Sequence, residues 1–167
     1  MSVIFGAAMS HVSKTKMSRV SDNEAVNAAN LAYYQALSAR NMRAMEQVWT
    51  RGADNILIAP PASPVTHIGW PAITRNLEHY CARFVDFNVS MQPSAINIIG
   101  PVAWVHGIEV SRRQTKIGAT SSSTNFGTNI FVAQNGGWFM VFHQSVAMPA
   151  PSRGVEHLGR TKPVSKA

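Results

Sequence analysis

Three histidines and one glutamate are the polar residues whose side chains could take part in acid–base chemistry. His67 directly precedes an expected helix, and His106 and His143 each lie where apolar and polar residues alternate. Glu109 shares a stretch with His106 but falls on its opposite face. Imidazole exchanges protons near neutral pH, so these residues indicate general acid–base chemistry. No residue that would orient a base is recognisable, and the alternative that His106 and His143 are hydrogen-bonded structural residues of a sheet stays open.

Other kinds of site find less support in the sequence. The histidines lack the HxH or HExxH spacing that brings two metal ligands to one face, so we expect no metal site and no cofactor. Ser145 and Cys81 have neither an adjacent base nor a nucleophile elbow. The side chains of Trp70, Trp104 and Trp138 suit either an apolar cavity wall or an ordinary core.

The net charge of +7 comes almost entirely from the two ends of the chain. Residues 1–20 and residues 151–167 each carry +3, whereas residues 21–150 hold eight basic and seven acidic side chains. Lys and Arg clusters bind phosphates, but basic ends of this kind are usually solvated. We therefore expect no specific nucleic-acid partner.

The cysteine content and the first residues bear on location. A single cysteine, Cys81, excludes an intramolecular disulfide and fits a reducing cytoplasm. The apolar run at residues 3–9 lacks a preceding basic region and is far shorter than the ~18 residues of a membrane span. We expect a cytoplasmic protein with no membrane partner.

Apolar spacing predicts three helices in the first half of the chain. A capping box at residues 21–24 predicts a helix that begins at Ser21 and ends near Ala39. Asn41 is placed to cap a second, short helix that ends near Gly52. A third helix is expected from Gly69 to Phe84, with proline in its first turn.

The second half has the period of two that is typical of strands. One short strand is expected earlier, at residues 55–59, and alternation resumes at Asp86 and continues to about Val146. Turns are expected at Gly100-Pro101 and Asn135-Gly136, and a loop or frayed strand end at residues 115–123. Helices followed by antiparallel strands predict an α+β domain. We place it at residues 21–149, between a flexible extension, 1–20, and a flexible basic tail, 150–167.

Segments spread over residues 24–148 resemble, in order, the SnoaL-like family of the nuclear-transport-factor-2-like superfamily. The first is YQALSARNMRAMEQVW at residues 34–49, and the others include AWVHGIE at 103–109, TNIF at 128–131 and GGWFMVFHQS at 136–145. The last segment is also similar to that of calcium/calmodulin-dependent kinase II association domains. The resemblance implies a cone-shaped α+β barrel, in which helices pack into the concave face of a strongly curved antiparallel sheet. It also implies a small-molecule pocket and a homodimer through the convex face.

The resemblance also suggests which chemistry to look for. Ketosteroid isomerase, a member of the superfamily, combines a tyrosine and a protonated aspartic acid as an oxyanion hole with an aspartate base. By similarity the tyrosine corresponds to Tyr33, but Ala59 replaces the base. The strand at residues 125–132 has no carboxylate, and its nearest polar residues are Thr128 and Asn129. Steroid-isomerase chemistry in that form is therefore not expected, and a histidine becomes the natural partner of Tyr33.

Two functions remain open. The first is an isomerase, cyclase or dehydratase that acts on a small apolar, oxygen-bearing metabolite, with Tyr33 and His143 as the catalytic candidates. The expected ligand-binding residues are Tyr33, His67, Trp70, Trp104, His106, Asn129 and His143. The second is a non-catalytic association module with a vestigial pocket.

Overall fold

The computed structural model describes residues 6–58 and 65–149, with side chains from residue 21 onward. Three helices and six strands make up the domain, which confirms the α+β class. The elements are α1 (Gly6–Ser38), α2 (Met42–Val48), β1 (Ile56–Ile58), β2 (Thr66–Ile68), α3 (Trp70–Cys81), β3 (Phe84–Ile99), β4 (Val102–Thr115), β5 (Thr120–Gln134) and β6 (Gly137–Ala147).

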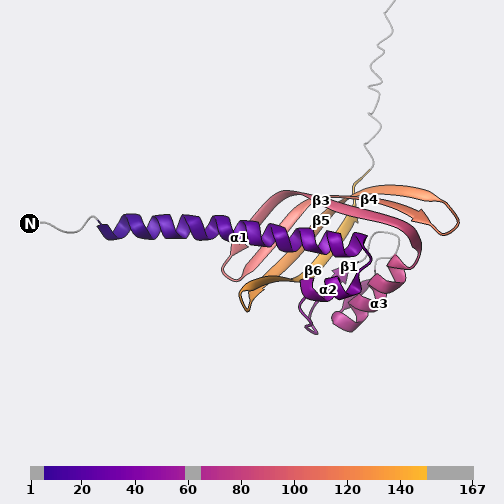
Figure 1. The fold of residues 1–167 in the computed structure, drawn as a ribbon, viewed down its shortest axis with the longest axis horizontal. Helices are drawn as coiled ribbons and strands as arrows, with labels where there is room; N and C mark the ends of the chain where they lie inside the picture. Colours follow the sequence, from indigo (N-terminus) through magenta and orange to yellow (C-terminus); the bar gives the residue numbers. More distant parts are fainter. Residues whose placement is uncertain (1–5, 59–64, 150–167) are drawn as a thin grey trace, which may run out of the picture.

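The six strands form one curved sheet in the order β2-β1-β6-β5-β4-β3. Neighbouring strands are antiparallel except β1 and β6, which run parallel. Strands β2 and β3 are the two edges, so the sheet is curved without closing into a barrel. Figure 1 shows α1 running along the sheet, with α2 and α3 near the end at which α1 stops.

Short polar signals set two of the connections. The Asn41 side chain accepts a hydrogen bond from the Ala44 amide at 3.0 Å, which confirms the predicted cap of α2. Between β5 and β6, Asn135 and Gly136 have φ values of 49° and 79°, as a two-residue hairpin with a primed turn requires. This turn fixes the pairing of β5 with β6, on which the candidate site depends.

Several predicted boundaries need correction. Helix α1 begins at Gly6, so Ser21 lies inside it; no proline or glycine between residues 7 and 38 interrupts the helix. Helix α2 ends at Val48, before the predicted Gly52, and Phe84 begins β3 instead of ending α3. Strand β2 was not expected at all. The predicted tail at 150–167 lies outside the described residues, and the flexible extension at 1–20 stays a prediction.

The core lies between the helices and one face of the sheet, which we call the inner face. The largest fully buried side chains include Tyr33, Met45, Trp49, Ile73 and Phe131. Burial of such side chains supplies most of the folding free energy, at roughly 25 cal/mol per Å² of apolar surface. On β4 and most of β5, odd-numbered residues face inward and even-numbered residues face the opposite side, the outer face.

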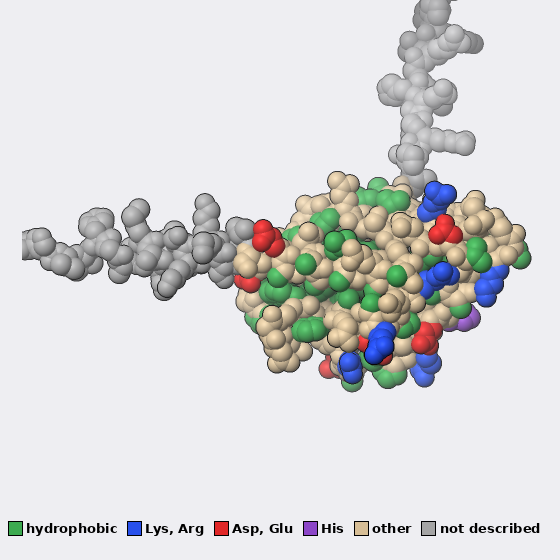
Figure 2. Space-filling model, viewed as in Figure 1, with side chains coloured by type: hydrophobic (Ala, Val, Ile, Leu, Met, Phe, Trp, Pro, Cys, Tyr) green, Lys and Arg blue, Asp and Glu red, His purple; other side chains and the backbone are tan. Residues whose placement is uncertain are grey.

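The surface of the domain carries charges of both signs. On the side that Figure 2 shows, Lys and Arg side chains gather toward the end of the molecule that holds α3, where acidic side chains lie among them. None of the described helices combines the length and the apolar character that a membrane crossing requires.

Candidate functional site

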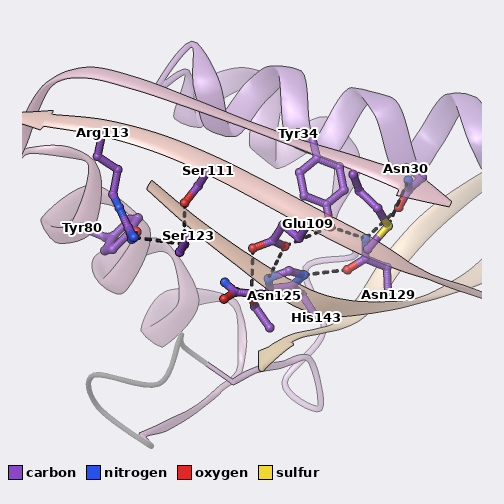
Figure 3. Close-up of polar contacts among 12 residues, drawn as sticks. Asn30, Tyr34, Tyr80, Glu109, Ser111, Arg113, Ser123, Asn125, Asn129 and His143 are labelled. Carbon is purple, nitrogen blue, oxygen red and sulfur yellow. Dashed lines mark hydrogen bonds and ion pairs between the residues drawn. The ribbon is translucent and has the colours of Figure 1, made fainter. Parts of the chain in front are cut away.

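Polar side chains are buried together on the inner face of β4, β5 and β6, against α1 (Figure 3). Each is at most 6% exposed. Polar groups buried to this extent are stable only when they are hydrogen-bonded. We call this set the inner network; its members are Asn30, Tyr34, Glu109, Asn125, Asn129, His143 and Ser145.

Asn129 is the centre of the inner network. Its Nδ2 donates to Asn30 Oδ1 at 2.7 Å and to the Tyr34 hydroxyl at 3.2 Å. Its Oδ1 lies 2.6 Å from Nδ1 of His143 and accepts the proton of that nitrogen. Because Nδ1 is the donor, a neutral His143 keeps a free lone pair on Nε2.

Glu109 completes the inner network on the other side of His143. Its Oε2 accepts a hydrogen bond from Tyr34 at 3.2 Å, and its Oε1 accepts one from Ser145 at 2.8 Å. Asn125 in turn donates to Ser145 at 2.9 Å. His143 Nε2 lies 3.9 Å from Glu109 Oε2, so a proton on Nε2 would face a carboxylate.

Burial decides the protonation states at this site. It lowers the pKa of His143, and the nearby Glu109 opposes this in part, so His143 is neutral at pH 7. Burial also raises the pKa of Tyr33 and of Tyr34, so both keep their phenolic protons. The site therefore combines a neutral imidazole, which can act as a base, with phenols, which can donate hydrogen bonds.

Tyr33 lies beside the inner network. Its ring centroid is 4.9 Å from that of His143, and the side chain is almost fully buried. Its hydroxyl donates to no residue that the structure describes, whereas the neighbouring Tyr34 hydroxyl is engaged on both sides. Within the described part of the chain, the hydroxyl of Tyr33 is therefore the one of this pair without an acceptor.

A small cavity borders these groups. Tyr33, Glu109 and His143 form its polar end, and Arg113 lies in its wall as well. Its volume is about 60 Å³, room for roughly two water molecules at ~30 Å³ each. Pockets that hold a drug-sized ligand usually measure about 300–1,000 Å³, so a ligand must widen this one. The remaining lining is mostly apolar and includes Leu37, Leu57, Leu77, Tyr80, Phe87 and Val89.

Strand register explains why these residues meet. Glu109 pairs with Asn125, and Asn129 pairs with His143, so each pair shares a face of the sheet. Gly127 lies between the two rows; a Cβ there would overlap the Met91 methyl group and lie 3.4 Å from both Glu109 Oε2 and the Tyr34 hydroxyl. The glycine therefore leaves room for Tyr34 to reach Glu109.

The structure brings together only part of the predicted ligand set. Tyr33 and His143 line the cavity, whereas Asn129 lies behind His143 and is joined to it by a hydrogen bond; their roles in binding stay predictions. Trp104 and His106 lie on the outer face, so the expectation that they line the cavity needs correction. The face of a strand cannot be chosen from alternation alone when both faces carry large side chains.

The other two expected residues are not among the described residues that line the cavity. Trp70 packs against Trp49, with ring centroids 6.3 Å apart. His67 is half-buried on the edge strand β2 and is not among the described residues that line the cavity. Among the described residues, no three His, Cys, Asp or Glu side chains come close enough to hold a metal ion. Ala59, the expected replacement of an aspartate base, lies outside the described residues.

Sequence reasoning missed Tyr34, Asn30, Asn125 and the role of Glu109. The usable signal was on the strands: Asn125 and Asn129 are four residues apart, so they share one face of β5 with the apolar Phe131. Amides on the face that also carries the core indicate a buried polar cluster. Tyr33 and Tyr34 are adjacent on α1, so the sequence did not indicate which of them hydrogen-bonds to residues of the sheet.

Comparisons with known proteins fit this architecture. A model of the SnoaL-like domain matches residues 26–151. None of the curated proteins matches the chain. A provisionally named dehydratase of the NTF2-like family from Streptomyces avermitilis is 18% identical, with a TM-score of 0.70, covering 78% of this chain and 99% of that one.

Two further solved structures have the same fold. A provisionally named aromatic ring hydroxylase from Novosphingobium aromaticivorans is 16% identical, with a TM-score of 0.71, covering 78% of this chain and 92% of that one. A provisionally named calcium/calmodulin-dependent protein kinase type II association domain from Thiobacillus denitrificans is 21% identical, with a TM-score of 0.61, covering 74% and 94%. Identities this low establish the fold alone. Because the domain model spans three quarters of the sequence, from residue 26 to residue 151, the chain belongs to the SnoaL-like domain family.

Proposed function

We propose that this protein is an enzyme that isomerises, cyclises or dehydrates a small oxygen-bearing molecule, and that His143 moves the proton. The observation that carries the proposal is the buried pair of His143 and Glu109, 3.9 Å apart, in the wall of a cavity. Buried acid–base pairs in a cavity are more common at catalytic sites than in ordinary cores.

In the proposed reaction, Nε2 of His143 takes a proton from a carbon next to the substrate's carbonyl. The imidazolium that forms is stabilised by the Glu109 carboxylate and by the bond from Nδ1 to Asn129. Tyr33 donates a hydrogen bond to the carbonyl oxygen, on which negative charge accumulates. His143 then returns the proton to another carbon, which completes an isomerisation, or to a departing hydroxyl group, which leaves as water. Proton transfer by a positioned group of this kind contributes typically 10²–10⁴-fold in rate.

Proton exchange tests the proposal without a known substrate. A panel of small ketones and β-hydroxy acids is incubated with the protein in D₂O, and loss of the α-proton signal is followed by NMR. We expect exchange of at least one compound, and a loss of about 10²–10⁴-fold in the His143→Gln variant. His106→Gln, the same change on the outer face, is the control and should keep the wild-type rate. Equal exchange rates in both variants, or none across the panel, contradict the proposal.

The second candidate is a non-catalytic association module, and two observations favour it. The cavity holds only about 60 Å³, and the outer face exposes apolar side chains: Val110 is 47% exposed, Phe126 38% and Val146 47%. Exposed apolar patches mark contact surfaces, so we propose a homodimer through the outer face under either function. Light scattering at micromolar concentration should give twice the chain mass, and a strict monomer refutes the dimer. We also propose a cytoplasmic location, on the basis of the single cysteine.

A further inference from the structure

Arg113 lies in the cavity wall at a distance from the acid–base pair. It follows Glu109 by four residues on β4 and faces the same side of the sheet, so the two Cα atoms are ~13 Å apart. No other lysine or arginine is among the described residues that line the cavity. Figure 3 shows its guanidinium with Tyr80 and Ser123, away from the group formed by Glu109 and His143.

The guanidinium has only neutral partners in the described part of the chain. Its Nη1 donates to the Tyr80 hydroxyl at 2.9 Å, and its Nη2 donates to Ser123 Oγ at 3.0 Å. No described carboxylate lies within ion-pair distance of it, and its buried Nε–H has no hydrogen-bond partner there. A half-buried cation without a counter-ion is costly, and an anion that entered the cavity would offset that cost.

We propose that Arg113 binds the carboxylate of the ligand, so that the ligand is a small monocarboxylic acid. The planar guanidinium fork matches a carboxylate, and Nε with the second hydrogen of Nη2 offers two parallel donors. A single cationic side chain suits a single negative charge. With the carboxylate at Arg113, the rest of the ligand extends toward Tyr33 and His143. That this second end of the ligand reacts rests on the proposed function.

The bonds of Arg113 also allow the widening that a ligand needs. Tyr80 belongs to α3, which forms one wall of the cavity through Asn76, Leu77 and Tyr80. The bond from Arg113 Nη1 to the Tyr80 hydroxyl ties this wall to β4, and its loss would release the wall while Nε and Nη2 hold the carboxylate. The competing explanation is that Arg113 only braces α3 and β5 through Tyr80 and Ser123.

Paired acids and amides separate these explanations. Butanoate, hexanoate and octanoate, and the three matching primary amides, are titrated into ¹⁵N-labelled protein, and Kd is taken from amide shifts. We expect at least one acid to bind wild-type protein at least tenfold more tightly than its amide. Arg113→Gln should reduce that acid to the affinity of the amide. Arg112→Gln removes the same charge from the neighbouring exposed residue and should bind as wild type does.

Two further variants address the brace. Tyr80→Phe and Ser123→Ala each remove one bond of Arg113 but keep its charge, so they should still prefer the acid. If Arg113→Gln does not fold, the acid-to-amide ratio of wild-type protein and of Arg113→Lys still decides, because Lys keeps the charge without the fork and should show a smaller ratio. The proposal is overturned if no acid is preferred over its amide, or if Arg113→Gln prefers acids as wild type does.

The outcome is independent of the catalytic assignment. His143→Gln should retain acid binding, because the side chain lies at the other end of the cavity. If acids bind through Arg113 while His143→Gln leaves proton exchange unchanged, the proposed function fails and the carboxylate site stands. If His143→Gln abolishes exchange while Arg113→Gln binds acids normally, the reverse holds.

Discussion

Both faces of strands β4, β5 and β6 carry some side chains that are unusual for their position. The inner face buries Glu109, Asn129 and His143, whereas the outer face exposes Phe126 and Val146. In most proteins apolar side chains are enriched inside and charged ones are almost never fully buried without partners. Buried polar residues on one face and exposed apolar residues on the other both indicate a use beyond folding. Inside, polar groups face a cavity; outside, apolar groups are available for contact.

Hydrogen bonding is what makes the inner face tolerable. Each member of the inner network is buried, and the members hydrogen-bond to one another through Asn129 and Glu109. The outer face has one comparable contact, between His106 Nδ1 and Thr128 Oγ1 at 3.0 Å, and it is exposed to solvent. Equivalent substitutions should therefore have unequal effects on the two faces.

The largest effect is expected at the centre of the inner network. Asn129→Leu preserves size but removes the acceptor for His143 and the donor to Asn30 and Tyr34, and should lower the free energy of unfolding by about 2–4 kcal/mol. Thr128→Val, the adjacent change on the outer face, should cost less than about 1 kcal/mol, because it removes a single side-chain hydrogen bond, the one to His106. Urea unfolding measures both, and equal losses would remove the distinction between the faces.

The pH dependence of stability should also separate the faces. Burial lowers the pKa of His143 in the folded protein, whereas the unfolded chain binds the proton near the ordinary value of 6.5. The free energy of unfolding therefore has its full value above about pH 6.5. It decreases as the pH falls from there through the lower pKa of the folded protein, by up to about 1.4 kcal/mol per pH unit, because the unfolded chain binds a proton that the folded protein does not. His143→Gln should remove this slope and His106→Gln should keep it. Unfolding curves between about pH 5 and 8 test the prediction, which an unchanged slope in His143→Gln would contradict.

Neighbouring tyrosines give a smaller contrast within the inner face. Tyr34→Phe removes the hydrogen bond to Glu109 and should lower the free energy of unfolding by about 1–2 kcal/mol. Tyr33→Phe removes a hydroxyl that donates to no described residue, so stability should stay within about 0.5 kcal/mol while ligand binding weakens by about 1 kcal/mol. Urea unfolding measures the first effect, and titration with a keto acid, whose ketone oxygen can accept a hydrogen bond from Tyr33, measures the second. The reverse order would make Tyr34 the residue that contacts the ligand.

The sequence was sufficient for the fold class and for much of its layout. Local chemistry determines the cap at Asn41 and the turn at Asn135-Gly136, and both were predictable because neighbouring residues decide them. The short strand β2 was missed because its three residues are held by pairing with β1, which no local pattern reveals. The helix start was misplaced because a capping box also fits inside a longer helix.

The site was harder to predict than the fold. Glu109 and His143 are 34 residues apart, and only the register of β4, β5 and β6 brings them together. The position of His106 on an alternating strand was correct, but alternation did not reveal which face is inside. A second feature that needs the paired strands is Gly107, where a Cβ would collide with the Gln92 backbone on β3.

The smallest effect is expected at the ends of the chain. A protein of residues 21–150 should keep its melting temperature within about 2 °C, because the buried apolar side chains begin at Val26 among those that the structure describes, and the first half of α1 extends beyond the sheet (Figure 1). In a shortened α1, Ser21 and Glu24 lie at the start of the helix, where they can form the capping box.

This difference provides a matched control. Ser21→Ala should cost about 0.5–2 kcal/mol in a trimmed protein that begins at residue 18, where Ser21 can become the N-cap, and almost nothing in the full chain, where Ser21 lies inside α1. Thermal unfolding of the full and trimmed proteins, each with and without Ser21→Ala, measures both effects. If trimming alone lowers the melting temperature by much more than about 2 °C, residues outside 21–150 contribute to the stability of the domain. The packing on the two faces of the sheet would then explain only part of that stability.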